Sequence, residues 1–317
     1  MKNKRLAAID IGTNTFRLLI AEVHPGPNQK NYSIKEICSK RTITRLGDGI
    51  AHDGAINEQA VTRGVRALKQ FSRIISRYRV EKISAVATSV LREAKNRRDF
   101  LDKAQDAAGL DIRVISGRQE AKLTASGMLI DMTPPEDALM LDIGGGSTEL
   151  IFMKGGKPLA VHSLDLGVVY LAGKYMMTDP PLTGDLMLME EEISGKIKSS
   201  VRPLKKLFSR DTVCIGTAGT VTALAAMSQN LRKFNHNKIH KYILTLESVN
   251  KIFSAISGLS SKERAEYIPF ELARLDIIVP GTLILLTLME SVGFKEITVS
   301  NYGLLEGILI DLYRKKR

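Results

Sequence analysis

Tryptophan is absent from this sequence, and aromatic residues make up only 5% of it. That scarcity argues against the stacked aromatic platforms that bind single-stranded nucleic acid. The two cysteines, Cys38 and Cys214, are too few for a disulfide framework and lack the spacing of a zinc site. The longest apolar run, Ile277 to Met289, contains Pro280 and Gly281 and is too short to cross a bilayer. We therefore expect a cytoplasmic protein with no membrane partner and no sequence-specific nucleic acid partner.

The chain of 317 residues is longer than one hydrophobic core usually serves, so two domains are expected. Apolar residues form 44% and charged residues 25%, which is typical of a soluble globular protein. The net charge of +12 is concentrated in residues 1–125, which hold 24 Lys and Arg against 13 Asp and Glu, whereas the rest holds 22 against 21. This asymmetry predicts an anion-binding face in the first half, without distinguishing nucleic acid, membrane and phosphate.

One sequence pattern occurs twice, at an offset of 132 residues. Residues 6–20 and 138–152 each show an apolar strand, an aspartate, a glycine-containing turn and a second apolar strand, which is typical of a β-hairpin. Strand and helix patterns follow both hairpins in a similar order. Helices are expected over residues 58–78, after an Asn57 cap, and over residues 97–108, 183–208 and 272–292. We therefore expect an α/β fold with two similar lobes, residues 1–130 and 131–317, in which the last helix (about residues 303–314) packs back on the first lobe.

The first hairpin turn, Asp10-Ile-Gly-Thr-Asn-Thr15, suits phosphate binding. Gly12 allows a positive φ and a close approach of a ligand to the backbone. The turn N–H groups and the hydroxyls of Thr13 and Thr15 form a nest for phosphate oxygens, and Asp10 is placed to hold a hydrated Mg²⁺. The alternative is a turn that only joins two strands.

Two further glycine-rich segments suit the same chemistry. In Asp142-Ile-Gly-Gly-Gly-Ser-Thr-Glu149, three successive glycines favour a tight bend or a close approach, and the two flanking acids can point to one metal ion. The segment Cys214 to Thr222 follows a strand and opens a helix, which presents free N–H groups to an anion or, alternatively, packs strand and helix closely. Neither segment matches a Rossmann or Walker motif.

Charged residues of the first half have two interpretations each. Glu120, in the first turn of a helix, either complements the helix dipole or takes a proton from an attacking water. Arg92, which follows a strand and a Thr88-Ser89 pair, and Arg17 beyond the first turn are either surface side chains or phosphate ligands. One long helix carries a basic stripe that is either a solvated face or a binding surface for a long polyanion. The stripe consists of Arg63, Arg66, Lys69, Arg73 and Arg77.

Six segments, in order and spacing, resemble the exopolyphosphatase and guanosine pentaphosphate phosphohydrolase family over residues 5–312. They are AAIDIGTNTFRLLIAEV, VATSVLREAKN, VISGRQEAKL, LDIGGGSTEL, CIGTAGTVTAL and SNYGLLEGIL. The resemblance implies the short, two-domain form of that family. It also implies two ribonuclease H-like lobes of the actin, Hsp70 and sugar-kinase type around an interlobe cleft, an essential Mg²⁺ and a homodimer.

The resemblance also implies roles for individual residues. Glu120 matches the glutamate that activates the attacking water, and Thr88 and Arg92 match positions that line the cleft in the first lobe. Asp10, Asp142 and Glu149 match the acidic positions near Mg²⁺. The expected phosphate-binding residues are Gly12, Thr13, Asn14, Thr15, Arg17, Thr88, Gly144, Gly145, Gly146, Ser147, Gly216, Thr217, Gly219 and Thr220.

The sequence departs from the family pattern at three positions. Asn301 and Leu305 stand where many relatives have Asp and Arg, and Lys241 stands where relatives often have Gly. The expected activity is release of terminal orthophosphate from inorganic polyphosphate, with hydrolysis of guanosine pentaphosphate (pppGpp) as the alternative. A stripe directed away from the site would remove the reason to rank polyphosphate first. A sensor that does not hydrolyse its ligand and an ATP-dependent kinase of the same superfamily are further alternatives.

Overall fold

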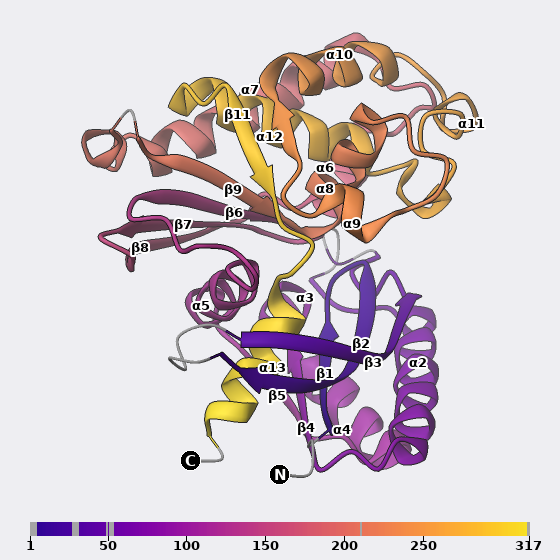
Figure 1. Ribbon diagram of the computed structural model, residues 1–317. Helices are drawn as coiled ribbons and strands as arrows, with labels where there is room; N and C mark the ends of the chain where they lie inside the picture. The colour runs from indigo at the N-terminus through magenta and orange to yellow at the C-terminus, as the bar shows by residue number, and fades with distance from the viewer. Residues whose placement is uncertain (1–4, 27–31, 49, 51–53, 210, 316–317) are drawn as a thin grey trace. The chain divides into compact units, whose positions relative to one another are not determined.

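The computed structural model describes residues 5–26, 32–48, 50, 54–209 and 211–315. The chain divides into two compact units (Figure 1). The first unit comprises residues 1–133 and 302–317, and the second comprises residues 134–301. The last helix, α13 (Leu304–Arg314), therefore belongs to the first unit although it follows the whole second unit in the sequence.

The first unit contains a five-stranded sheet with the order β3-β2-β1-β4-β5. Strands β1 to β3 are antiparallel, and β4 and β5 run parallel to β1, so the carboxyl ends of β1, β4 and β5 share one edge. The strands are β1 (Arg5–Ile11), β2 (Thr15–Pro25), β3 (Tyr32–Ile43), β4 (Lys82–Ala87) and β5 (Ile112–Val114). Strand β1 is the central strand, which explains why almost all of its side chains are apolar and buried.

Helices cover both faces of this sheet. Alternate residues of β1 pack to opposite faces, Ala7 and Ile9 toward α2 and α4, and Leu6 and Ala8 toward α13. Asn57 begins α2 as predicted, since its Oδ1 accepts a hydrogen bond from Ala60 N at 2.8 Å. The helices are α2 (Glu58–Arg77), α3 (Ser89–Glu93), α4 (Arg97–Ala108), α5 (Gly117–Met128) and α13.

The second unit contains a six-stranded sheet with the order β10-β11-β9-β6-β7-β8. An antiparallel β6-β7-β8 meander is followed by β9 and β11, which run parallel to β6, as β4 and β5 run parallel to β1. The strands are β6 (Ala138–Ile143), β7 (Thr148–Lys154), β8 (Lys157–Leu164), β9 (Val213–Thr217), β10 (Ile243–Thr245) and β11 (Glu296–Val299). The predicted α/β class is confirmed. A hairpin opens the sheet of each unit.

Two predicted helices of the second unit differ from the structure. A helix predicted over residues 183–208 ends at Val201, since Pro203 lacks the N–H that would continue it. A helix predicted over residues 272–292 is a 3₁₀ turn followed by α12, with Pro280 in the first turn of α12, where a missing N–H is tolerated. The helices are α6 (Val168–Tyr175), α7 (Thr183–Val201), η1 (Lys205–Leu207), α8 (Ala218–Ser228), α9 (His236–Ile239), α10 (Leu246–Ile256), α11 (Ser261–Arg264), η2 (Leu272–Arg274) and α12 (Ile278–Val292). Among the described residues, no helix has the length and apolar character needed to cross a membrane.

A charged cluster around Glu192 joins α6 to α7. Lys174 Nζ and Tyr175 Oη each donate a hydrogen bond of 2.6 Å to Glu192 Oε2, and Lys196 Nζ lies 2.8 Å from Oε1. Burial by itself raises the pKa of Glu192, but the hydrogen bonds from Lys174, Lys196 and Tyr175 outweigh it and lower the pKa to about 2 from its ordinary 4.5. Folding is thus coupled to ionisation of this carboxyl group.

This coupling predicts an acid-dependent contribution to stability. Because the pKa is lowered in the folded state, the stabilisation is fully present above 4.5 and is lost as the pH falls toward about 2. Thermal unfolding of wild type and Glu192→Gln should therefore differ most near neutral pH, with a difference that shrinks between pH 4.5 and 2. A stability difference that stays constant over this pH range would show that Glu192 stabilises the fold through packing and not through its charge.

Candidate active site

The two hairpin turns have the same backbone geometry. Gly12 N donates to Thr15 O at 3.2 Å, and Gly144 N donates to Ser147 O at 2.9 Å, which are equivalent positions of the repeat. Neither glycine has a positive φ, so the conformational freedom expected of Gly12 is not used here. The repeat seen in the sequence is therefore a repeat of structure, closed by the same hydrogen bond in each unit.

The first hairpin places an aspartate opposite an arginine. Asp10 and Arg17 are cross-strand partners, and Arg17 Nε and Nη2 lie 2.8 and 2.7 Å from Asp10 Oδ2. Asp10 is only 4% exposed, and among the described residues its Oδ1 has no hydrogen-bond partner. A buried carboxylate oxygen with an unfilled acceptor is costly and suits a cation or an ordered water.

The second hairpin places two acids opposite each other. Asp142 and Glu149 are cross-strand partners at the positions equivalent to Asp10 and Arg17, and both are buried. Ser147 Oγ and Ser163 Oγ donate to Glu149 Oε1 at 2.7 and 2.8 Å. Like charges directly opposite on a sheet repel each other, so a cation beside this pair would be stabilising. The chemistry of the donors therefore fits a divalent ion bound through carboxylates and water.

Neighbouring backbone braces each turn. Thr44 N and Arg45 N donate to Asn14 O at 3.1 and 2.9 Å in the first turn. In the second turn, the first amides of α6 donate to Gly144 O and Gly145 O at 3.1 and 2.9 Å. Gly167, which precedes α6, lies so close to this turn that a Cβ on it would stand 2.2 Å from Gly145 O. Sequence reasoning did not identify Gly167, because only the folded contact makes a glycine necessary there.

Thr88, Arg92 and Glu120 lie at the carboxyl edge of the first sheet, with the first turn. Thr88 N donates to Ile11 O at 3.3 Å. Arg92 Nη1 donates to Glu120 Oε2 at 2.6 Å and to Ile115 O at 3.1 Å. The Glu120 side chain is 10% exposed and lies in the first turn of α5, which the Ser116 capping box orients. The structure thus joins the predicted base and the predicted arginine in one partly buried ion pair.

The third glycine segment is strained and is covered by an arginine. Ala218, at the start of α8, has a φ of 69°, a left-handed conformation that is costly for alanine. A Cβ on Gly219 would stand 1.6 Å from Arg274 Nη2, so the guanidinium lies directly on this backbone. Arg274 Nε in turn lies 2.6 Å from Glu271 Oε1. Sequence reasoning missed Arg274, since no local signal links it to this segment.

The predicted site residues divide between the two units. Asp10, Gly12, Thr13, Asn14, Thr15, Arg17, Thr88, Arg92 and Glu120 lie in the first unit, and Asp142, Gly144, Gly145, Gly146, Ser147, Glu149, Gly216, Thr217, Gly219 and Thr220 lie in the second. In each unit they gather at the carboxyl ends of the parallel strands, the usual ligand-binding edge of an α/β sheet. Gly216 and Thr217 end β9 itself, and Thr217 Oγ1 donates to Ser300 O at 3.0 Å. Within the described ranges, no three His, Cys, Asp or Glu side chains form a metal-binding group.

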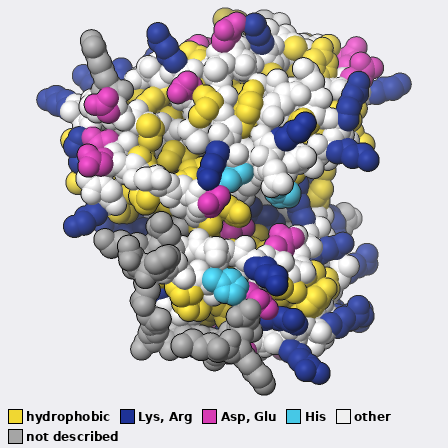
Figure 2. All heavy atoms as spheres, in the orientation of Figure 1, with side chains coloured by type: hydrophobic (Ala, Val, Ile, Leu, Met, Phe, Trp, Pro, Cys, Tyr) yellow, Lys and Arg dark blue, Asp and Glu magenta, His cyan; other side chains and the backbone are white. Residues whose placement is uncertain are grey.

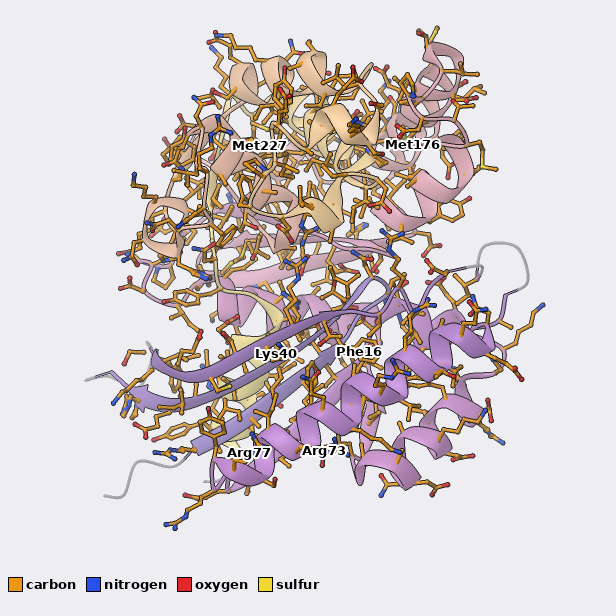
Figure 3. All side chains as sticks on the ribbon, turned by 90° about the vertical axis from the view of Figure 1, so that its right-hand side faces the viewer. Phe16, Lys40, Arg73, Arg77, Met176 and Met227 are labelled. Carbon is orange, nitrogen blue, oxygen red and sulfur yellow. The ribbon has the colours of Figure 1, made fainter. Side chains whose placement is uncertain are left out.

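The basic stripe of α2 points away from its own sheet. Arg66, Lys69, Arg73 and Arg77 are exposed, on the side of the helix opposite the buried residues Gly64, Leu68 and Phe71. Lys and Arg side chains gather at the lower right of Figure 2, where α2 lies in Figure 1, and Figure 3 shows Arg73 and Arg77 on the helix that faces the viewer. Arg63 differs, since its Nε donates to Thr44 O at 2.7 Å.

Three known proteins match this chain over nearly the full length of both partners. The sequence is 29% identical over 318 residues to exopolyphosphatase 2 of Mycobacterium tuberculosis, covering 97% of this chain and 98% of that protein. The structure of an Aquifex aeolicus Ppx/GppA family member has a TM-score of 0.80 at 30% identity and covers 99% of both chains. An exopolyphosphatase structure from Cytophaga hutchinsonii has a TM-score of 0.86 at 30% identity and covers 98% of both. Because the family model also matches residues 21–316, this chain belongs to the Ppx/GppA phosphatase family.

Proposed function

We propose that this protein hydrolyses the terminal phosphoanhydride bond of inorganic polyphosphate. The observation that carries the proposal is the partly buried Arg92–Glu120 pair at the edge of the sheet that also holds the first turn. Glu120 takes a proton from water, the water oxygen attacks the terminal phosphorus, and the bond to the bridging oxygen breaks to release orthophosphate. A positioned general base of this kind contributes about 10²–10⁴-fold to the rate.

Arg92 has two tasks in this proposal. Its Nη1 holds Glu120 Oε2, which fixes the carboxylate that must meet the water. The planar guanidinium is also the group best suited to bind a phosphoryl oxygen through paired donors. The hairpin turns, Thr88 and the start of α8 supply further donors that position the phosphate chain.

Asp10, Asp142 and Glu149 are the residues that we propose to hold Mg²⁺. The unfilled, buried Oδ1 of Asp10 and the facing carboxylates of Asp142 and Glu149 support this assignment. Mg²⁺, when bound, neutralises negative charge on the terminal phosphate groups. The carboxylates of the chain would hold the ion mainly through water, as magnesium sites in proteins commonly do.

Four of the five residues of the basic stripe on α2 face solvent, so the stripe is not a wall of the candidate active site. The preference for polyphosphate over pppGpp therefore needs another basis. It rests on the likeness to proteins named exopolyphosphatase and on where the stripe begins. Arg63 bonds to Thr44 O, and Thr44 N bonds to Asn14 O in the first turn, so one end of α2 adjoins that turn. From Arg63 the helix runs on to Arg77, a rise of about 21 Å that only a long chain can follow.

Phosphate release from long polyphosphate and from pppGpp, measured in parallel with Mg²⁺ varied, tests the proposal. We expect Arg66→Gln, Arg73→Gln and Arg77→Gln, combined, to weaken binding of long polyphosphate and to reduce its salt dependence, because fewer counterions are released. Activity on pppGpp should be unchanged. Equal losses on both substrates, or none, would make the stripe a solvated face and leave pppGpp as the preferred substrate.

Two experimental outcomes would show that the protein has a function other than hydrolysis. Transfer of phosphate from ATP to an added acceptor would identify a kinase. Tight binding of polyphosphate without phosphate release, under any divalent metal, would identify a sensor. Either result would contradict the role proposed for Glu120.

A further inference from the structure

A cavity lies in the first unit, at the edge of the sheet opposite the candidate active site. It has a volume of about 370 Å³ and is formed where β4 and β5 begin and α13 ends. Ser84 and Asp111 line it, whereas Thr88 and Glu120 follow the other ends of the same strands. The volume suits a small metabolite. None of the residues assigned above to phosphate or metal binding contributes to it.

Arg113 supplies an unpaired positive charge to this cavity. It is exposed, and its hydrogen bond within the described chain runs from Nη2 to Ser84 Oγ at 3.1 Å. No acidic side chain in the described residues pairs with it. A guanidinium with free donors matches the two oxygens of a carboxylate, and the Ser84 hydroxyl, which accepts from Arg113, can donate its own proton to the same group.

Asp111 supplies an unpaired negative charge on the same wall. It is exposed and has no ion pair among the residues that the structure describes, whereas Asp311 is neutralised by Lys315 at 2.7 Å. Gly109, at the C-terminal end of α4, also lines the cavity. The negative end of that helix dipole and the Asp111 carboxylate both favour a cation.

The remaining wall is apolar, formed in part by Leu110 and Leu312. We propose that this cavity binds a small zwitterion of the amino-acid type, with its carboxylate on Arg113 and Ser84 and its amine beside Asp111. A simple anion would meet the uncompensated charge of Asp111, and a simple amine would meet that of Arg113. A ligand with both groups pairs both charges and places its aliphatic part on the leucines.

Saturation-transfer NMR of the full-length protein with each standard L-amino acid, at millimolar concentration, tests the proposal. Calorimetric titration of any amino acid that binds then compares wild type with Arg113→Ala and Asp111→Asn. Arg232→Ala is the matched control, since Arg232 is an exposed arginine of the second unit. We expect each cavity variant to weaken binding by about tenfold or more and the control to leave it unchanged.

The ligand itself supplies a second control. The same amino acid without its amine, and the same without its carboxylate, should each bind more weakly than the intact compound. The proposal is overturned if no amino acid binds, if binding survives both cavity substitutions, or if the deaminated acid binds as tightly. Because the readout is binding at a site distant from Glu120, failure here would leave the proposed hydrolysis unaffected.

Discussion

Glu120→Gln is expected to lower the turnover of polyphosphate by about two orders of magnitude or more. Glutamine keeps the size of the side chain, and its carbonyl oxygen can still accept the 2.6 Å hydrogen bond from Arg92 Nη1. It cannot take a proton from water. The substitution should therefore remove the proton transfer while the position of the side chain is preserved, so the loss should appear in kcat and not in KM.

Phosphate release under saturating polyphosphate, together with a direct measurement of polyphosphate affinity, checks this expectation. Glu58→Gln is a suitable control, since Glu58 is an exposed acid at the start of α2 with no assigned role. Full activity of Glu120→Gln would reject the general base. A loss confined to affinity would instead make Glu120 a residue that organises Arg92 for phosphate binding.

Gly167→Ala is expected to destabilise the protein by about 1–3 kcal/mol or more and to reduce phosphate release. The added Cβ would stand 2.2 Å from both Gly145 O and Gly146 C. These are backbone atoms of the second turn, so no side chain can rotate to relieve the overlap. Either α6 or the turn must move, and the hydrogen bonds from α6 to Gly144 O and Gly145 O would be strained.

Gly173→Ala, within α6, is the matched control. A Cβ on Gly173 meets nothing within 4 Å, and its φ is not positive. Alanine is the better helix former, so this variant should gain up to about 1 kcal/mol. Urea unfolding and phosphate release of both variants separate the two effects. A Gly167→Ala protein as stable and active as wild type would mean that α6 does not brace the turn.

Local patterns were enough to predict most of the fold. The hairpins show it best, because apolar alternation, the aspartate and the glycines all lie within 15 residues of one another. Helix α4, predicted over residues 97–108, has the same bounds in the structure, and Asn57 caps α2. Strand β10 and helix α9 were not predicted, since elements of three and four residues carry too little periodicity.

The candidate site was less accessible to sequence reasoning. The residues of each turn could be named, because turn chemistry is local, but the Arg92–Glu120 bond depends on β4 and β5 being neighbours. Arg274 over Gly219 depends on the packing of η2 against α8. The departures from the family pattern gain a physical meaning only in the fold. Leu305 is buried in the core beside β1, and Lys241 has a φ of 65°, a conformation that glycine adopts more readily than lysine.

The position of α13 has a consequence for biosynthesis. One face of the first sheet, including Leu6, Ala8 and Val86, is covered by Leu304, Ile308 and Leu309 of that helix. These residues leave the ribosome only after the entire second unit has been translated. The first unit therefore cannot complete its core during translation. Until the last helix emerges, the apolar face of its sheet stays exposed, where chaperones can bind it or aggregation can begin.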